Sequence, residues 1–411
     1  MTTRDGAGAY FRWATLLTVF LFTVGYALIG FGFLFLGTLW LLIRRHGVLW
    51  QPSQLDLPLA VFGAVLLVSA AVSPYRTLAF EVTFMLIISG AVYFGSFSWL
   101  LAHDPGLPKT LLRTWALGGV GAALAGLVYG ATHYLEGSPP GTFYHARAQI
   151  PRGVGPNGLG TTLLLASVIA LSLAAGARGW RRALWALCGF VGFAGLLASA
   201  SRASLAGWLV AVVYLTCTEL RLRPKQLLAA LAGGLVIVAL ATAATPQFMG
   251  RLRYTVSDVS HNRIQIWRES FDMVQAHPVL GTGFGTFERE YARHKGPAMS
   301  SEPFAFNLAL NLAVETGLLG LLAALWVAFA AFRIWRSADQ RSPSAKSLRS
   351  LTGALWLGLL VNQLADNTLF SISTSAGLWL LLAMTIAPPR AMSGPDAQRA
   401  EAPSAATSLV S

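Results

Sequence analysis

Two arginines stand in sequence contexts where a guanidinium can bind an acidic ligand. Arg202 lies in Ser201-Arg202-Ala203-Ser204, between two apolar stretches, and its small neighbours leave room for a large ligand. Arg263 begins a segment in which apolar residues recur at helical spacing. A guanidinium is planar and can bind a phosphate or a carboxylate through two parallel hydrogen bonds. The alternatives are an interfacial charge for Arg202 and a solvated surface charge for Arg263.

Other charged residues can support such a site. Arg147 and Arg152 flank a stretch that contains glycine and proline, and they either extend the anion site or belong to a solvated loop. Glu315 and Asp366 fall within or at the end of apolar stretches, where a charged side chain is costly. Each carboxylate is a candidate for neutralising or orienting an arginine, and the alternative for each is no such role.

Several other chemistries lack their motifs in this sequence. There is no Asp-x-Asp pair, no His-Glu-x-x-His and no Cys/His cluster, so we predict no metal site. No Walker loop is present, which argues against ATP as the energy source. Gly281-Thr-Gly283-Phe-Gly285 is not a dinucleotide fingerprint, because no strand–turn–helix unit surrounds it. We therefore predict no cofactor.

The composition indicates which elements must position these residues. Of the 411 residues, 55% are hydrophobic and 11% are charged, whereas soluble globular domains carry about 25% charged residues. Two cysteines are too few for a disulfide scaffold. The net charge of +13 is dispersed among apolar stretches and does not indicate nucleic acid. The chain is predicted to be an all-α polytopic membrane protein.

The apolar stretches predict about twelve membrane-spanning helices. A helix that crosses a hydrocarbon core of about 30 Å needs about 20 mostly apolar residues. The stretch from Trp13 to Ile43 is too long for one comfortable span, and Gly25 and Gly30 indicate a break within it. The predicted spans are residues 13–25, 27–43, 57–73, 79–101, 110–132, 158–176, 183–200, 203–219, 226–244, 307–332, 351–366 and 371–388.

The loops between these spans predict the orientation and four parts of the chain. Dense basic clusters such as Arg44-Arg45 and the 333–349 loop fall inside if both termini are cytoplasmic, as the preference of Lys and Arg for cytoplasmic loops requires. Residues 1–244 then hold spans one to nine, 245–306 form a long outer loop, 307–388 hold spans ten to twelve, and 389–411 form a flexible cytoplasmic tail.

The long outer loop is expected to carry an amphipathic helix. Ile264, Trp267, Phe271 and Val274 recur at helical spacing. Arg263 is expected to point with Ile264 and Trp267 toward the surface that this helix covers. Arg268, in the same helix, is expected to be solvated.

Three local sequence patterns accompany the predicted topology. The first is Ser201-Arg202 at a span end; the second is Arg263-x-x-x-Trp267, followed by Pro278-x-x-Gly281-x-Gly283; the third is Asn307, then nine residues, then Gly317-x-x-Gly320. With the topology, they resemble the O-antigen ligases, within the wider family that includes O-antigen polymerases and bacterial O-oligosaccharyltransferases.

This resemblance implies a GT-C-like membrane glycosyltransferase of the bacterial inner membrane, with a periplasmic active site. It implies transfer of a polysaccharide from undecaprenyl diphosphate to a sugar hydroxyl of lipid A–core, in lipopolysaccharide biosynthesis, with inversion and without a metal. Arg202 and Arg263 would offset the charge that develops on the diphosphate. The substrate-binding residues would be Arg147, Arg152, Trp267, His294 and Asn307.

One residue departs from the family pattern. The ligases carry histidine immediately before that asparagine, and this chain has Phe306. The resemblance implies that this histidine is the catalytic base. Phenylalanine cannot accept a proton. Three readings remain open: an engineered inactive variant, a natural lineage that uses another group such as His294, or a mechanism that needs no base. The otherwise intact motif favours the first.

Other functions remain as alternatives. An O-antigen polymerase uses the same lipid-linked donor, and the spacing from Asn307 to Gly317 favours a ligase over it. A protein O-oligosaccharyltransferase differs mainly in its acceptor. A secondary transporter also fits twelve spans, but transporters commonly show repeated halves and charges at the midplane, and here the charges gather at the outer edge.

Overall fold

The computed structural model describes residues 6–43, 50–104, 106–135, 149, 155–220, 263–295, 304–338, 343–369 and 371–387. Within these ranges the regular structure is helical, and no strand occurs in them. The predicted all-α class is confirmed for this part of the chain.

Five of the described helices are long and apolar enough to cross a membrane. Three further apolar helices are shorter, namely Ala27–Ile43, Asp56–Val72 and Thr374–Ile386. The chain is therefore a helical membrane protein. The count of twelve spans stays a prediction, and the predicted span 226–244 lies outside the described residues. The five long segments are Arg76–His103, Leu107–Thr132, Pro156–Gly176, Trp180–Ser199 and Leu308–Ser337.

The first apolar stretch is divided into two helices, as predicted. Helix α1 (Gly6–Thr23) and helix α2 (Ala27–Ile43) are separated at Gly25, whose φ is 89°. This left-handed backbone is accessible to glycine without a steric penalty. Gly30 has another role: a Cβ there would come 2.8 Å from the Cα of Thr18, so it allows the two helices to pack closely.

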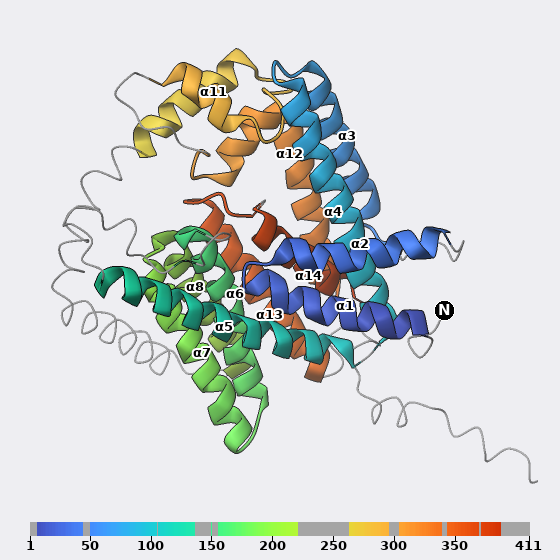
Figure 1. Ribbon diagram of the computed structural model, residues 1–411, viewed down its shortest axis with the longest axis vertical. Helices are drawn as coiled ribbons and strands as arrows, with labels where there is room; N and C mark the ends of the chain where they lie inside the picture. The colour runs from blue at the N-terminus through green and yellow to red at the C-terminus, as the bar shows by residue number, and fades with distance from the viewer. Residues whose placement is uncertain are drawn as a thin grey trace, which may run out of the picture.

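Most of the other helices pack in two groups. Helices α3 (Asp56–Val72), α4 (Arg76–His103) and α12 (Leu308–Ser337) lie side by side, and α14 (Ile372–Ile386) packs on α4 (Figure 1). The second group holds α6 (Pro156–Gly176), α7 (Trp180–Ser199), α8 (Arg202–Leu215) and α13 (Pro343–Gln363). Helix α5 (Leu107–Leu135) packs against α1, α6 and α7.

The helical part of the outer loop lies at one end of α3, α4 and α12 (Figure 1). It contains a helix over residues 263–276 and helix α11 (Phe287–His294). A helix was predicted here, but its buried face differs in part from the prediction. Ile266 and Met273 are buried, whereas Ile264 and Phe271 are exposed. Because each residue turns the helix by about 100°, the face that holds Arg263 and Trp267 continues through 266, 270, 273 and 274.

Candidate functional site

The loop between helix 263–276 and α11 is joined to α12 at a break in that helix. Gly317, inside α12, has φ 65° and ψ −172°, a conformation that is essentially restricted to glycine. In an unbroken helix, the carbonyls of residues 314 and 315 would accept from N–H groups four residues later. Here the N–H of Thr282 donates to Val314 O at 3.1 Å. The N–H of Gly283 donates to Glu315 O at 2.7 Å.

The exchange of hydrogen bonds is reciprocal. Beyond the break, the N–H of Leu318 donates to Pro278 O at 2.8 Å, and the N–H of Leu319 donates to Val279 O at 3.3 Å. Backbone groups that the break leaves without helical partners are thus paired with the loop, as buried backbone groups require. We call the paired segments 278–285 and 314–320 the glycine interlock.

Glycines in the interlock allow the two backbones to touch. Gly281, Gly283 and Gly285 all have positive φ. A Cβ on Gly281 would lie 2.5 Å from the carbonyl carbon of Glu315, and a Cβ on Gly317 would lie 2.2 Å from Val279 O. The two glycine patterns noted in the sequence therefore meet in one structure and act on the backbone.

Helix α3 fixes the interlock from the other side. The hydroxyl of Ser69 donates to Leu280 O at 2.6 Å and lies 3.2 Å from Glu315 O. The hydroxyl of Ser73 donates to Thr282 O. Both serines are buried. Two side chains from a distant part of the sequence therefore satisfy carbonyls of the loop and of α12.

Glu315 supports the loop. The sequence left open whether its carboxylate neutralises or orients an arginine or has no such role. In the structure it is buried and accepts from the N–H of Phe287 at 3.1 Å, with Gly285 N–H and the Asn311 side chain as further partners. Within the described residues, no ion pair joins it to an arginine. The carboxylate lies at the start of α11, where the first N–H groups of a helix have no helical partner and can donate to it.

The segment before α12 presents Phe306. The indole N–H of Trp267 donates to Ala305 O at 2.8 Å, and the N–H of Ala305 donates to Asn311 Oδ1 at 3.0 Å. Phe306 follows with φ 53°. Asn307 then caps α12 by accepting from the N–H of Leu310 at 3.0 Å. Trp267 and Asn307 thus fix the backbone on both sides of position 306.

Arg263 lies against this position. Its guanidinium carbon is 4.9 Å from the ring centroid of Phe306, and Nη1 donates to Ala365 O at 2.8 Å. The side-chain amide of Asn307 donates to Leu364 O at 3.0 Å. Helix 263–276, the start of α12 and the loop after α13 are therefore joined at one point.

The end of α13 contacts α8 close to Arg202, and the loop after α13 contacts α6. Asn362 donates through Nδ2 to Ser204 Oγ at 2.9 Å, and Thr368 Oγ1 lies 2.9 Å from Thr161 Oγ1 of α6. Ser201 caps α8, and Arg202 is its exposed first residue. We call Arg202, Arg263, Phe306 and the loop 364–369 the arginine shelf.

A set of buried polar side chains next to the arginine shelf was not predicted from the sequence. Asn362, Gln363, Thr368 and Thr161 are buried and hydrogen-bonded to one another. The sequence feature that indicates them is the polar run Asn362-Gln363 and Asp366-Asn367-Thr368 at the end of an apolar stretch. Only the charged residue of this run was singled out as a candidate. Asp366 itself is buried beside Ala365 and accepts from the N–H of Asn367 at 2.9 Å.

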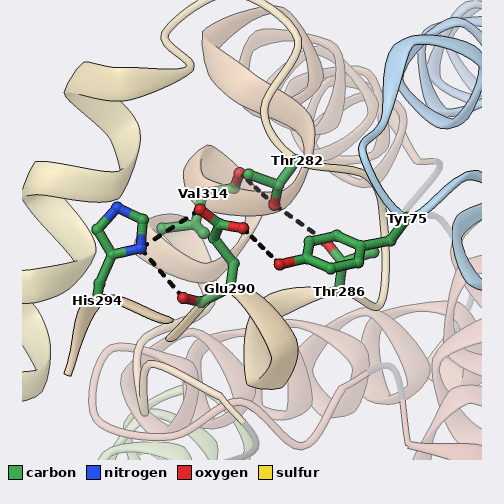
Figure 2. A network of polar contacts seen from close by, with 6 residues as sticks. All are labelled: Tyr75, Thr282, Thr286, Glu290, His294 and Val314. Carbon is green, nitrogen blue, oxygen red and sulfur yellow. Dashed lines mark hydrogen bonds and ion pairs between the residues drawn. The ribbon is translucent and has the colours of Figure 1, made fainter. Parts of the chain in front are cut away.

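The other predicted site residues lie elsewhere. His294 ends α11, and its Nδ1 lies 3.1 Å from Glu290 O and 3.3 Å from Glu290 Oε1 (Figure 2). Arg147 and Arg152 fall outside the described residues. Arg268 is exposed, as expected. No group of three or more His, Cys, Asp or Glu side chains that could hold a metal occurs within the described ranges.

Comparison with known proteins bears on the same segment. Residues 186–325 match the family model described as O-antigen ligase. The match covers Arg202, Arg263, Phe306 and the whole glycine interlock. No curated protein gives a significant match to the chain. Residues 186–325 are therefore similar to the O-antigen ligases, which supports the resemblance noted in the sequence.

Proposed function

We propose that the chain transfers a polysaccharide from undecaprenyl diphosphate to a sugar hydroxyl of lipid A–core. The observation that carries this proposal is the arginine shelf. Arg263 from the outer helix donates to Ala365 O in the loop after α13. Arg202 begins α8, whose Ser204 accepts from Asn362 near the end of α13. A lipid diphosphate requires this combination, an apolar surface for its chain and cations for its headgroup.

The arginines supply the charge that the reaction needs. When the sugar hydroxyl attacks the anomeric carbon, the bond to the diphosphate oxygen breaks and negative charge grows on the leaving group. Fixed cations at that point lower the barrier without a general acid. A single displacement inverts the anomeric configuration. Arg263 is held in place because its Nη1 donates to Ala365 O at 2.8 Å.

Position 306 supplies a ring instead of a base in this chain. Phe306 supports the Arg263 guanidinium through its face, but it cannot take the proton from the acceptor hydroxyl. Its left-handed φ of 53° is a conformation in which histidine is several-fold enriched over most side chains. We therefore propose that histidine fits this position and that the chain, as it stands, is a disabled or slow form.

The proposed topology follows the distribution of charges. Twelve spans with both termini in the cytoplasm would place the arginine shelf at the periplasmic face of the inner membrane. Membrane lipids and the lipid-linked donor would then reach the shelf laterally. The runner-up within this class is a polymerase, which would use the same donor and a lipid-linked glycan as acceptor.

The test is glycan transfer in membranes that lack their own ligase, with lipid A–core and lipid-linked glycan offered as separate acceptors. The variants are made on Phe306→His, so that a measurable rate is available. Adding Arg202→Ala or Arg263→Ala is expected to lower transfer by about 100-fold to 1,000-fold. Arg268→Ala, which removes an exposed arginine from the same outer helix, is the matched control. Equal rates for the shelf variants and the control would refute the proposal that Arg202 and Arg263 bind the diphosphate.

A further inference from the structure

A second basic site lies between the α3–α4 connection and α11. A cleft of about 780 Å³ is lined there by residues that include Tyr75, Arg76, His277, Arg289, Glu290 and Arg293. None of these residues belongs to the arginine shelf. The volume lies within the range of about 300–1,000 Å³ that is usual for small-molecule sites.

The acidic residue of this cleft already has partners within the protein. Glu290 is buried, and its Oε2 accepts from the Tyr75 hydroxyl at 2.8 Å while Oε1 lies 3.3 Å from His294 Nδ1 (Figure 2). Burial of the phenol, with Glu290 as its hydrogen-bond acceptor, raises the pKa of Tyr75 to about 12. The hydroxyl therefore stays protonated at neutral pH and keeps donating to the carboxylate.

The three arginines keep their charge available. Arg76, Arg289 and Arg293 are exposed. Arg293 stacks on Tyr75 with its guanidinium carbon 4.7 Å from the ring centroid, a contact that leaves N–H groups at the edge of the plane. Within the described residues, no ion pair joins any of the three to a carboxylate. Three cations and one carboxylate give the cleft a net charge of +2.

The helix that carries two of these arginines is fixed in place. Phe287 and Tyr291 on its opposite side are buried. The loop before it is held by Thr282, whose hydroxyl lies 2.9 Å from that of Thr286 (Figure 2). Arg289 and Arg293 are four residues apart and therefore share a face of α11. A ligand would find these groups already positioned, which lowers the entropic cost of binding.

We propose that this cleft binds a phosphomonoester. A phosphomonoester carries close to two negative charges at neutral pH and three acceptor oxygens, which match a net charge of +2 and three guanidinium groups. Arginine recognises such oxygens through pairs of parallel hydrogen bonds. The group can be carried by a membrane lipid or by a soluble phosphorylated sugar. This inference does not rest on the transfer reaction, because binding alone defines it.

The experiment measures binding to the full-length protein in phosphatidylcholine nanodiscs. One arm adds phosphatidic acid and follows its retention by native mass spectrometry; the other titrates soluble glucosamine 1-phosphate by calorimetry. Arg289→Gln and Arg293→Gln are each expected to weaken binding about tenfold or more, as loss of a charged hydrogen bond does. Arg268→Gln removes one exposed arginine outside the cleft and is expected to leave binding unchanged.

The arms identify the carrier of the phosphate. Preferential retention of phosphatidic acid supports a lipid-borne ligand, and binding of glucosamine 1-phosphate supports a soluble one. The proposal is overturned if the unmodified protein retains no excess phosphatidic acid and binds no glucosamine 1-phosphate. It is equally overturned if Arg268→Gln weakens binding as much as Arg289→Gln. Thermal unfolding of each variant checks that the fold is kept.

Discussion

The glycine interlock and the arginine shelf both contain residues of one sequence pattern, Arg263-x-x-x-Trp267 followed by Pro278-x-x-Gly281-x-Gly283. The two regions are held together in opposite ways. The interlock is buried and held by backbone hydrogen bonds, and its glycines matter because they lack side chains. The shelf depends on long side chains, with Arg202 exposed and Arg263 resting on Phe306. The glycines therefore determine where the loop and α12 lie, while the arginines supply charge to whatever binds above them.

The largest expected effect comes from breaking the interlock with Gly317→Ala. The φ/ψ pair of Gly317 costs a residue with a side chain about 1–3 kcal/mol, and a methyl group 2.2 Å from Val279 O adds about 1–3 kcal/mol of overpacking. Together they offset about 2–6 of the roughly 5–15 kcal/mol that stabilise a domain, so we expect a large loss of thermal stability and a smaller yield of folded protein. Fluorescence-detected size-exclusion chromatography of a fusion protein measures that loss.

The matched control for this substitution is Gly32→Ala in α2. A Cβ on Gly32 would meet no atom within 4 Å, and alanine is favoured over glycine inside a helix by about 1 kcal/mol. We expect Gly32→Ala to be folded at the unmodified level. If Gly317→Ala were equally well folded, the interlock would not be the framework that we describe.

The next effect sharpens the shelf. Phe306→His is expected to raise glycan transfer by about 100-fold, the lower end of what a positioned general base contributes. The structural reason is that position 306 is fixed between Trp267 and Asn307 and adjoins Arg263. The measurement is the initial transfer rate in ligase-deficient membranes, with equal protein levels confirmed by blotting.

Phe306→Asn serves as the control for that gain. Asparagine also tolerates left-handed backbone but is no base at neutral pH, so it should leave the rate unchanged. If asparagine raised the transfer rate as much as histidine, the gain would come from removal of the phenylalanine ring and not from proton transfer.

The contrast between the two regions also explains what the sequence could predict. The helices and the break at Gly25 follow from apolar length and from glycine, which are local properties. Ser69 of α3 contacts the interlock at Glu315 O, and no local pattern indicates a contact between residues so far apart in the chain. The partners of Glu315 could not be predicted for the same reason, because they include backbone groups supplied by a distant loop.

The arginines were easier to single out than to orient. Arg202 and Arg263 were noticed because charges at membrane edges are costly. The partner of Arg263 is a backbone carbonyl, Ala365 O, and any residue type could supply it. The buried face of helix 263–276 was partly misassigned because Ile264 and Phe271 are apolar yet exposed, so hydrophobicity alone did not indicate which side is covered.

A smaller effect tests whether the rigidity of the interlock extends to α11. Tyr75→Phe removes the hydroxyl that donates to the buried Glu290 carboxylate at 2.8 Å. Leaving a buried acceptor without this donor is expected to cost about 1–2 kcal/mol. Thermal unfolding in detergent, read against the unmodified protein at neutral pH, gives the difference.

The pH dependence of this difference has a defined sign. The pKa of Tyr75 is raised from 10.0 to about 12 in the folded protein. The folded state therefore holds this proton more tightly, and the stabilisation is fully present below pH 10 and is lost as pH rises from 10 to about 12. The unmodified protein should approach the stability of Tyr75→Phe over that interval, and a constant gap would exclude the phenol as its source.

The smallest effect compares two buried serines. Ser69→Ala removes a hydroxyl that donates across to Leu280 O at 2.6 Å, whereas Ser98→Ala removes one that donates to Gly95 O at 3.2 Å within its own helix. A helical carbonyl keeps its backbone partner when the serine is lost, but Leu280 O belongs to the loop of the interlock and depends on this donor. We therefore expect Ser69→Ala to lower the free energy of unfolding by about 1 kcal/mol more than Ser98→Ala does, measured as the shift in thermal unfolding. Equal shifts would mean that backbone pairing alone holds the interlock, and that α3 packs beside it without stabilising it through hydrogen bonds.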